Sequence, residues 1–389
     1  MSLRIVSIQH GDYREALQII ASGQTEPYFG MKYSVDLLEK FVENDQNLII
    51  SLTTVPYSIR RKRGELVGIP EPKLPRPIPG RVAEFLLARR ILKKIREFRP
   101  THVLLRTGRP AIVSQVLRYA KERGCNTLVV FANFLFNDNP RSRRVNREIT
   151  ALMNEPFVFR VGNHKWPATQ SLVDSGLNPA KAVAWDWPGQ RTARDYPVKE
   201  LSPPPFHLVY AGSTTVHKGV GDLIDAASIL HACGVKFRFS ILGSGGDFDA
   251  LKEKADSLPE GLIDFKGRLP NGEVFQFMRD ATLVFVPSRH SFHEGLPLTL
   301  TEGLASRTPL IVSDHPVMVR AFQDNQGLLF FRASDPASLA SVTQAVLEDP
   351  AEYRRLSETT ADALDRVDCP FSFGDLLDEW KQTFANGQG

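Results

Sequence analysis

Short apolar runs rich in β-branched and aromatic residues alternate with stretches of helical periodicity through the second half of the chain. The runs predict strands at 207–210, 236–242, 262–265, 283–286, 310–312 and 328–331. The stretches between them predict helices at 220–232, 248–257, 272–279, 297–305, 317–322 and 337–347. This alternation is typical of a parallel sheet with helices on both faces, in which ligands bind at the carboxyl ends of the strands.

The first half shows the same alternation with less regular spacing. Its pattern predicts strands at 4–8, 48–52, 102–105, 128–131, 158–161 and 182–185, and helices at 35–42, 81–98, 112–123, 144–154 and 167–175. The segment Pro56–Pro79 is rich in proline and basic residues, which predicts a long loop. Pro203-Pro204-Pro205 predicts a stiff, extended connector, so we expect a domain boundary near residues 187–205.

The composition is that of a soluble globular protein, with 42% hydrophobic and 24% charged residues. No apolar run reaches the roughly 18–20 residues that a membrane-spanning helix needs, and the N-terminal residues do not resemble a secretory signal. The three cysteines are scattered along the chain, at positions 125, 233 and 369. Their number and spacing predict a protein of the reducing cytoplasm, without a disulfide framework or a structural zinc site.

The charge is unevenly distributed. Residues 1–200 hold 32 Lys and Arg against 19 Asp and Glu, whereas the remainder holds 16 against 25. The basic residues cluster at 60–63, 89–96 and 141–147. Such clusters attract an anionic membrane surface, a phosphorylated acceptor or nucleic acid, although solvated helix faces would look the same. Nucleic acid is the partner that we do not expect, because aromatic residues are not interleaved with the basic ones.

A first candidate site is the segment Gly212–Gly219, which follows a predicted strand and precedes a predicted helix. Such a junction presents unpaired backbone N–H groups and the positive end of a helix dipole, which favour phosphate. Lys218 would add a positive charge at the same place. The glycine spacing is not that of a Walker loop, and on spacing alone Lys218 could equally be a solvated loop lysine.

A second candidate segment follows the predicted strand that ends at Val286. Glu294 directly precedes a predicted helix and Glu302 lies within it, surrounded by leucines. We expect Glu294 to accept hydrogen bonds from sugar hydroxyls and Glu302 from a ribose diol. Pro297 suits the first helical turn but has no N–H. The amides expected to donate to a phosphate are therefore those of Leu298 and Thr299. The alternative is that Glu294 caps the helix and Glu302 is solvated.

Together the two segments resemble the retaining glycosyltransferases of family 4, the glycosyl transferases group 1. The resemblance rests on Gly212 and Lys218-Gly219, followed by Pro287-Ser288, Glu294-Gly295 and Glu302. Further landmarks of the family fall in order at Ile241–Gly245, Asp264–Arg268, Ala305–Val312 and Phe371–Phe373. The resemblance covers residues 206–385 well and the first half by its general rhythm. It implies an α/β fold of two Rossmann-like, doubly wound parallel-sheet domains that face each other across a cleft, the GT-B fold.

The resemblance also implies the domain roles. Residues 1–190 would form an acceptor-binding domain, 191–205 a linker and 206–368 a nucleotide-sugar-binding domain. A helix within 369–389 would return to the first domain. The implied reaction is retaining transfer of a sugar from a UDP- or GDP-type donor to an unknown lipid-linked, phosphorylated or glycan acceptor. It would need neither metal nor cofactor, and it would take place in the cytoplasm, where the basic first domain could contact the inner face of the membrane.

Carried over by position, the resemblance gives Lys218 the donor diphosphate, Glu294 the transferred sugar and Glu302 the nucleotide ribose. Leaving-group charge would be stabilised by position and electrostatics, with Lys218 and Glu294 as the catalytic residues. The other donor-binding residues implied are Gly212, Ser213, Gly243, Arg268, Arg289, Gly295, Leu298 and Thr299.

Departures from the family pattern keep other activities open. Ser213 stands where the family usually has an arginine, and we expect Arg289 or His293 to supply the missing charge. Gly30 is the candidate for the family's glycine loop after the first strand, and Asn133 stands near the position of its histidine. A catalytically weak binding protein and a sugar-nucleotide epimerase or hydrolase therefore remain alternatives. The Asp247-Phe248-Asp249 sequence resembles a metal motif of a different fold, but its position predicts helix capping by Asp247.

Overall fold

The chain divides into two units, each built around its own sheet. Unit 1 combines Met1–Pro188 with Cys369–Gly389, and unit 2 comprises Gly189–Asp368. The computed structural model describes residues 3–24, 26, 30–75, 79–135, 137, 139–188, 191–292, 295–322, 326–369 and 371–385. Among these residues, the helices are all too short or too polar to cross a membrane.

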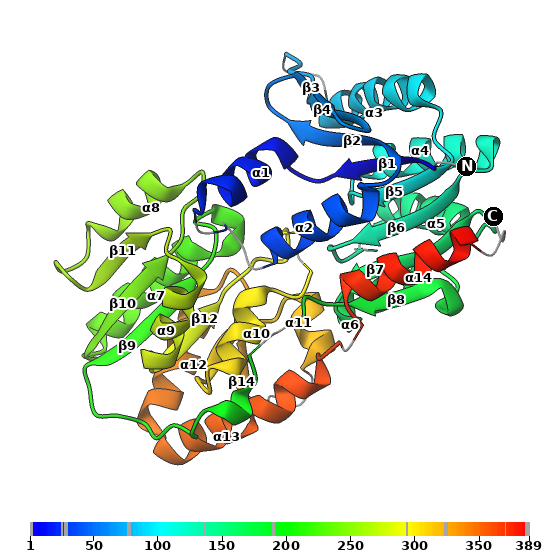
Figure 1. Cartoon of the computed structure of the whole chain (residues 1–389). Helices are drawn as coiled ribbons and strands as arrows, with labels where there is room; N and C mark the ends of the chain where they lie inside the picture. The colour runs from blue at the N-terminus through cyan, green and yellow to red at the C-terminus, as the bar shows by residue number, and fades with distance from the viewer. Residues whose placement is uncertain are drawn as a thin grey trace. The chain divides into compact units, whose positions relative to one another are not determined.

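Unit 1 contains an 8-stranded sheet with the strand order β3-β4-β2-β1-β5-β6-β7-β8 (Figure 1). Its strands are β1 (Arg4–Gln9), β2 (Gln46–Thr53), β3 (Tyr57–Arg61), β4 (Gly64–Pro70), β5 (His102–Arg106), β6 (Asn126–Phe131), β7 (Val158–His164) and β8 (Ala182–Trp185). All neighbouring pairs are parallel except β3 and β4. Its helices are α1 (Tyr13–Ser22), α2 (Met31–Val42), α3 (Gly80–Phe98), α4 (Pro110–Arg123), α5 (Pro140–Met153), α6 (Trp166–Asp174) and α14 (Phe373–Ala385).

Apolar clusters cover both faces of this sheet. Along β1, Val6 and Ile8 join one cluster, whereas Ile5 joins the other, as the two-residue repeat of a strand requires. The C-terminal helix α14 completes the second cluster: Trp380 is fully buried and its ring stacks on Phe41 at 5.7 Å between centroids. Burial of large side chains such as these, at about 1.5–3 kcal/mol each, fixes α14 on unit 1 although it is the last element in the sequence.

The prediction of a long loop at Pro56–Pro79 is wrong, because β3 and β4 form a hairpin there. Tyr57 pairs with Gly68 and Arg61 with Gly64, so Lys62 and Arg63 form the turn. Exposed charges on β3 concealed the strand pattern in the sequence. The same charges suit an edge strand, because they discourage pairing with another chain. Helix α1, which begins after the capping residue Asp12, was also missed.

Unit 2 contains a 6-stranded, fully parallel sheet with the order β11-β10-β9-β12-β13-β14. Its strands are β9 (Phe206–Ala211), β10 (Phe237–Leu242), β11 (Ile263–Gly267), β12 (Leu283–Val286), β13 (Leu310–Ser313) and β14 (Leu328–Phe331). Its helices are α7 (Val220–Ala232), α8 (Phe248–Ala255), α9 (Asn271–Asp280), α10 (Leu298–Ala305), α11 (Pro316–Ala321), α12 (Pro336–Glu348) and α13 (Pro350–Arg366). Helix α13 was not predicted, because Pro350 looks like a helix stop but here begins a new helix.

The strand order of unit 2 is the 3-2-1-4-5-6 order of Rossmann folds. The order reverses between β9 and β12, which are neighbours in the sheet. In such sheets the loops that follow these two strands diverge and leave a crevice where ligands bind. The loop after β9 is the Gly212–Gly219 segment, and the loop after β12 begins at Pro287.

Candidate active site

The two loops that the sequence marked as candidate sites meet at the reversal of strand order in unit 2. The backbone N–H of Arg289 donates to the carbonyl of His217 at 3.0 Å. The His217 ring and the Ser291 hydroxyl form a second hydrogen bond at 3.2 Å. Two segments about 70 residues apart in the sequence therefore form one structure, at the place where a Rossmann sheet binds its ligand.

Glycines allow the backbones of these loops to approach closely. A Cβ at Gly219 would lie 2.1 Å from the Pro287 carbonyl oxygen, and Gly219 has a φ of +74°. A Cβ at Gly243, in the loop after β10, would lie 1.9 Å from the Gly212 carbonyl oxygen. Larger side chains at these two positions would push the three loops apart. The predicted donor residues Gly212 and Gly243 thus lie together.

Asp247 holds the first loop in place. The sequence predicts that it caps helix α8, and it does occupy the capping position, but its side chain makes no capping hydrogen bond. Its carboxylate instead accepts from the backbone N–H of Val216 at 2.8 Å. The capping prediction is therefore wrong in its chemistry, because the neighbouring loop offers the carboxylate a better-placed donor. Ser213 is exposed in this loop, and its carbonyl accepts from the Tyr210 hydroxyl at 2.8 Å.

Lys218 lies at the junction of the two loops. It ends a short 3₁₀ helix (Val216–Lys218), and its ammonium nitrogen lies 4.8 Å from the centre of the Phe292 ring in the second loop. A partly exposed cation–π contact is worth about 0.5–1 kcal/mol. That is weak compared with the attraction between an ammonium and a diphosphate in a confined site, so this contact would not by itself prevent Lys218 from binding a phosphate.

Arg289 is engaged by a buried carboxylate. Its Nε and Nη2 donate to the two oxygens of Asp222 at 2.9 and 2.6 Å, and Asp222, on α7, is 4% exposed. The hydrogen bonds and charge of Asp222 raise the pKa of Arg289. Bidentate pairs of this kind fix geometry. The pair therefore anchors the second loop on α7 and offsets the charge of Arg289. That Arg289 supplies charge to a diphosphate stays a prediction. His293, the other candidate, lies outside the described residues.

Helix α10 points its first turn at the end of β9. It begins at Leu298, directly after Pro297, and the Thr299 hydroxyl donates to the Ala211 carbonyl at 2.8 Å. The N–H groups of the first turn of a helix have no partner within the helix and carry its positive dipole end. The amides of Leu298 and Thr299 thus belong to a turn that is positioned beside the loop of Lys218, as an anion site requires.

Glu302 is held inside unit 2 rather than solvated. Its Oε1 accepts from the Asn271 side-chain amide at 2.7 Å. Burial raises the pKa of Glu302, while the Asn271 hydrogen bond and the Arg191 charge act in the opposite direction. Sequence reasoning missed Asn271 and Arg191, because neither belongs to a motif and both reach Glu302 through tertiary packing.

The remaining donor-site predictions are less constrained. Arg268 is exposed just after β11, and Gly295 is described, but Glu294 lies outside the described residues. Within the described part of the chain, no three His, Cys, Asp or Glu side chains gather closely enough to hold a metal ion.

In unit 1, one predicted site residue is elsewhere than expected. Gly30 does not follow β1 but directly precedes α2, where a Cβ would lie 2.6 Å from the Trp187 ring. The glycine that follows β1 is Gly11, which has a φ of +84°. Asn133 follows β6 as expected, and a Cβ at Gly108 would lie 2.6 Å from its Oδ1. Asn133 thus faces the loop after β5.

The strand order of unit 1 also reverses, between β1 and β5. Basic side chains gather at this point. Arg106 donates to the Gln9 side-chain oxygen at 3.1 Å, and Arg109 pairs with Glu71 at 3.0 Å. Burial and the Arg109 charge lower the pKa of His10. Ligands bind beside the loops at a reversal of strand order, so a known strand order would point to the residues that follow β1 and β5. The sequence pattern alone does not give that order.

Comparison with known proteins gives a partial sequence match. Residues 194–362 match the family model described as glycosyl transferases group 1. The chain is 26% identical over 152 residues to the amylovoran biosynthesis glycosyltransferase AmsK of Erwinia amylovora, covering 38% of this chain and 37% of that protein. It is 28% identical over 155 residues to a GDP-mannose-dependent alpha-(1-6)-phosphatidylinositol dimannoside mannosyltransferase of Mycobacterium tuberculosis, covering 40% and 39%. The chain thus spans less than half the length of these curated relatives.

Solved structures match over nearly the whole chain. Sucrose-phosphate synthase from Thermosynechococcus elongatus matches with a TM-score of 0.62 and 14% identity over 98% of both chains. HepE from Anabaena, solved in complex with UDP-glucose, matches with a TM-score of 0.59 and 13% identity over 99% of this chain and 100% of that one. At such identities the likeness concerns the fold. The predicted fold class, two Rossmann-like α/β domains of the GT-B type, is confirmed, while the cleft between the domains stays a prediction.

Proposed function

We propose that this chain, which belongs to the glycosyl transferases group 1 family through residues 194–362, transfers a sugar with retention from a nucleoside-diphosphate sugar to an acceptor bound by unit 1. One observation carries the proposal. The loops after β9 and β12 are joined at the reversal of strand order, with Lys218 at their junction and the first turn of α10 beside them.

In this proposal the donor diphosphate lies between Lys218 and the first turn of α10. The ammonium and the amides of Leu298 and Thr299 offset the negative charge that grows on the leaving phosphate as the sugar departs. Such fixed, preorganised charges act mainly by stabilising the transition state. The acceptor hydroxyl would lose its proton to the departing phosphate, so no protein base is assigned.

Glu302 would accept a hydrogen bond from the ribose, and Glu294 would orient the transferred sugar. The role of Glu302 is supported by its half-buried, hydrogen-bonded position, whereas the role of Glu294 rests on its place in the motif. The nucleobase of the donor would lie beyond the ribose, near Gly243 and Arg268 at the ends of β10 and β11. One relative named above is GDP-mannose-dependent, and one of the solved structures contains UDP-glucose, so we propose a GDP- or UDP-type donor.

A second function is favoured by one specific feature. Ser213 replaces a cation, and Asp222 neutralises Arg289, so the described part of the diphosphate site relies on Lys218 for its side-chain charge. This would suit a protein that binds a sugar nucleotide with little transfer, or one that only hydrolyses or epimerises it. Comparing sugar transfer with free-sugar release, and both with binding alone, separates the three activities.

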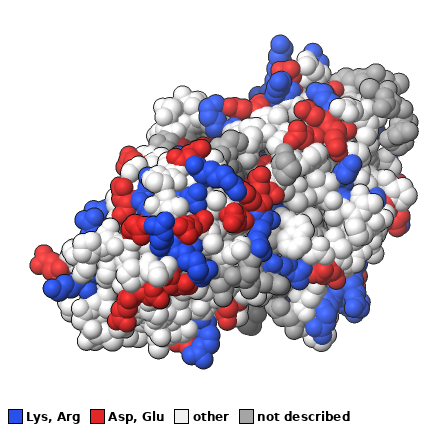
Figure 2. All heavy atoms as spheres, turned by 90° about the horizontal axis from the view of Figure 1, so that it is seen from below, with Lys and Arg blue, Asp and Glu red and all other residues white. Residues whose placement is uncertain are grey.

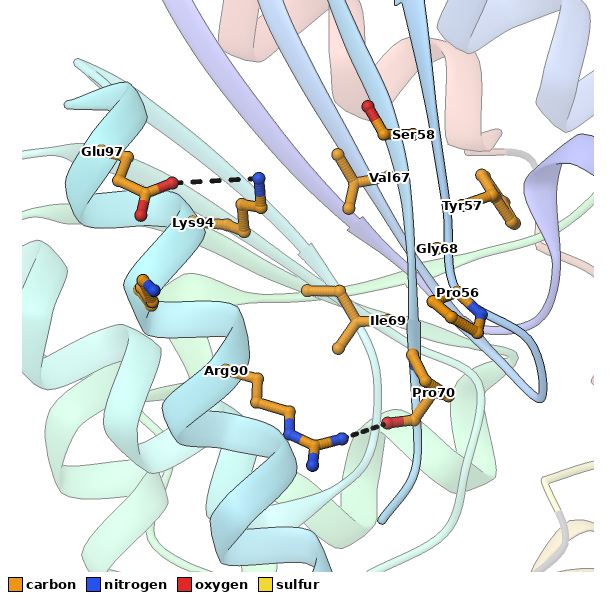
Figure 3. Close-up of a pocket in the computed structure, with 11 residues that line it drawn as sticks. Pro56, Tyr57, Ser58, Val67, Gly68, Ile69, Pro70, Arg90, Lys94 and Glu97 are labelled. Atoms are coloured by element: carbon orange, nitrogen blue, oxygen red, sulfur yellow. Dashed lines mark hydrogen bonds and ion pairs between the residues drawn. The ribbon is translucent and has the colours of Figure 1, made fainter.

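The acceptor side is supported by a pocket in unit 1. It has a volume of about 490 Å³ and lies between the β3–β4 hairpin and α3 (Figure 3). Val67 and Ile69 of β4 point toward α3, which contributes Arg90, Lys93 and Lys94. Arg90 donates to the Pro70 carbonyl at 3.3 Å, and Lys94 pairs with Glu97 at 3.8 Å. A pocket with an apolar wall and a cationic rim favours an acceptor that has a hydrocarbon part and a negative charge.

Exposed apolar side chains accompany these cations. Val55 and Ile59 on the hairpin side and Val82 and Phe85 on α3 are between 37% and 58% exposed. Together with the basic residues they suit peripheral contact with an anionic membrane in the cytoplasm. On the face drawn in Figure 2, by contrast, basic and acidic side chains are interspersed. We therefore propose a lipid-linked or phosphorylated acceptor, with a neutral glycan as the alternative.

The test is a screen of UDP, GDP and their sugars by thermal shift, followed by a transfer assay with the donor that binds. A true ligand at 100 times its dissociation constant should stabilise the protein by about 2.7 kcal/mol. Stabilisation by one nucleotide, together with loss of that stabilisation in Lys218→Ala, supports the proposal. A wild-type protein that no nucleoside diphosphate stabilises would overturn it.

A further inference from the structure

Glu302 is held by a chain of contacts that begins outside the sheet of unit 2. Asn271, the first residue of α9, donates from Nδ2 to Glu302 Oε1 at 2.7 Å. The Oδ1 of the same amide lies 3.5 Å from Nη1 of Arg191, which is the donor. Both ends of the amide are therefore occupied, which fixes its orientation: the nitrogen must face the carboxylate and the oxygen must face the guanidinium.

Arg191 is itself held by α9. Its guanidinium carbon lies 4.1 Å from the centre of the Phe275 ring, and Phe275 is buried one helical turn beyond Asn271. This contact holds the guanidinium beside α9, within reach of the Asn271 side chain. The residue belongs to the segment that opens unit 2, just after the end of unit 1 at Pro188.

Other charged side chains near α10 are directed elsewhere. Arg307, at its C-terminal end, donates to backbone carbonyls, including that of Ala193 at 2.8 Å. Arg194, in the 3₁₀ helix Ala193–Asp195 that packs against α10, pairs with Asp365 of α13 at 2.7 Å. Among the described residues, the charge that acts on the half-buried Glu302 carboxylate is therefore that of Arg191.

We propose that Arg191 and Asn271 are positioning residues of the nucleotide site, which hold Glu302 as an oriented carboxylate for the ribose. Asn271 occupies one carboxylate oxygen, which leaves Oε2 to accept from a ribose hydroxyl. Arg191 keeps the carboxylate ionised and keeps Asn271 in the orientation that donates to it. The proposal deepens the proposed function and rests on it, and it gives a residue of the segment that opens unit 2 an indirect role in nucleotide affinity.

The first test measures binding of UDP and GDP by calorimetry, together with their 2′,3′-dideoxy analogues. Loss of a hydrogen bond to a charged group typically weakens binding about tenfold. We expect Arg191→Gln and Asn271→Ala to weaken binding of the ribonucleotide by about that factor, and binding of the dideoxy analogue by less than about twofold, since it has no hydroxyl to offer. In a Glu302→Gln background, Arg191→Gln should add less than about a further twofold.

The second test is a pH profile of the same binding, because a purely structural role would not change it. Burial raises the pKa of Glu302 and Arg191 opposes that shift. Binding that needs the ionised carboxylate is lost as the pH falls through this pKa. In Arg191→Gln the pKa rises further, so the loss should begin at a higher pH than in the wild type, whereas Arg191→Lys should retain the wild-type profile.

Arg194→Gln is the matched control, because it removes a neighbouring arginine that pairs with α13 instead. It should bind both nucleotides as the wild type does. If Arg191→Gln weakens the ribonucleotide and the dideoxy analogue equally at every pH, Arg191 only supports the fold and the inference is overturned. If it binds like the wild type, the inference also fails while the proposed function stands. If the wild type binds neither nucleotide, both fail.

Discussion

In both sheets the strand order reverses beside the first strand, but the residues at that reversal differ between the two units. In unit 2 the loops meet backbone to backbone through Gly212, Gly219 and Gly243, and Lys218 is the cation at their junction. In unit 1 the corresponding point carries long side chains, Gln9, Arg106 and Arg109, that bond to one another or to Glu71. Under the proposed function, amides and one ammonium of unit 2 would recognise a diphosphate common to many donors, and side chains of unit 1 would recognise the acceptor.

Of the variants that test this contrast, Lys218→Ala is expected to have the largest effect, which is a loss of sugar transfer. Removing one group that stabilises transition-state charge typically lowers kcat/KM by about 10²–10³-fold. The contact with Phe292 that this variant loses is worth about 0.5–1 kcal/mol, so thermal unfolding of the variant is measured beside its activity. The assay is transfer from the bound nucleotide sugar, with Lys254→Ala as the control, since Lys254 is an exposed lysine of unit 2 that pairs with Asp225. Activity equal in the two variants would contradict the role of Lys218.

Arg289→Ala should mainly reduce stability. It leaves the buried Asp222 carboxylate without its partner, which should lower the free energy of unfolding by about 1–3 kcal/mol. Denaturant unfolding measures this loss. The double variant Arg289→Met/Asp222→Leu removes both charges and should regain much of the stability together with donor affinity. If the double variant is stable but still fails to bind the nucleotide, Arg289 contacts the diphosphate after all.

Gly219→Ala tests the close approach of the loops. The added Cβ would meet the Pro287 carbonyl at 2.1 Å in a backbone with a φ of +74°, so we expect a loss of about 2 kcal/mol and weaker donor binding. Gly11→Ala in unit 1 has a similar φ but no atom within 4 Å, so strain alone should cost about 1 kcal/mol. Equal losses in thermal unfolding would show that the loops of unit 2 are no more tightly joined than those of unit 1.

The smallest effect is expected at the pocket of unit 1. Arg90→Gln/Lys94→Gln should raise the KM for an anionic acceptor by about three- to tenfold, and the difference should shrink as salt screens the charges. Donor affinity should not change. Glu97→Gln, which removes a negative charge from the same rim, is the opposite control and should lower that KM. A neutral glycan acceptor would leave both variants at the wild-type KM.

Much of unit 2 could be predicted from its sequence because strands such as β12 and β14 are short, continuous apolar runs. All six predicted strands are present there. The β3–β4 hairpin of unit 1 could not, because the exposed side chains of Arg60 and Ser58 interrupt the apolar pattern of an edge strand. Helix α1, which the sequence pattern does not predict, lies between β1 and Gly30, so the glycine that follows β1 is Gly11.

The site shows the same division. Gly212, Lys218 and Thr299 follow from local motifs, since each depends on a strand end or a helix start nearby in sequence. Arg191 and Asn271 do not, because tertiary packing alone brings them to Glu302. The carboxylate of Asp247 bonds to another loop in preference to its own helix, a choice that propensity does not encode.

The central claim is that unit 2 binds the donor diphosphate through Lys218 and the first turn of α10. Calorimetric titration of UDP and GDP into the wild type, Lys218→Ala and Arg109→Gln tests it most directly. The account predicts that one of the two nucleotides binds the wild type and Arg109→Gln with equal affinity and binds Lys218→Ala at least about tenfold more weakly. Equal binding to the wild type and Lys218→Ala, or a loss confined to Arg109→Gln, would contradict it.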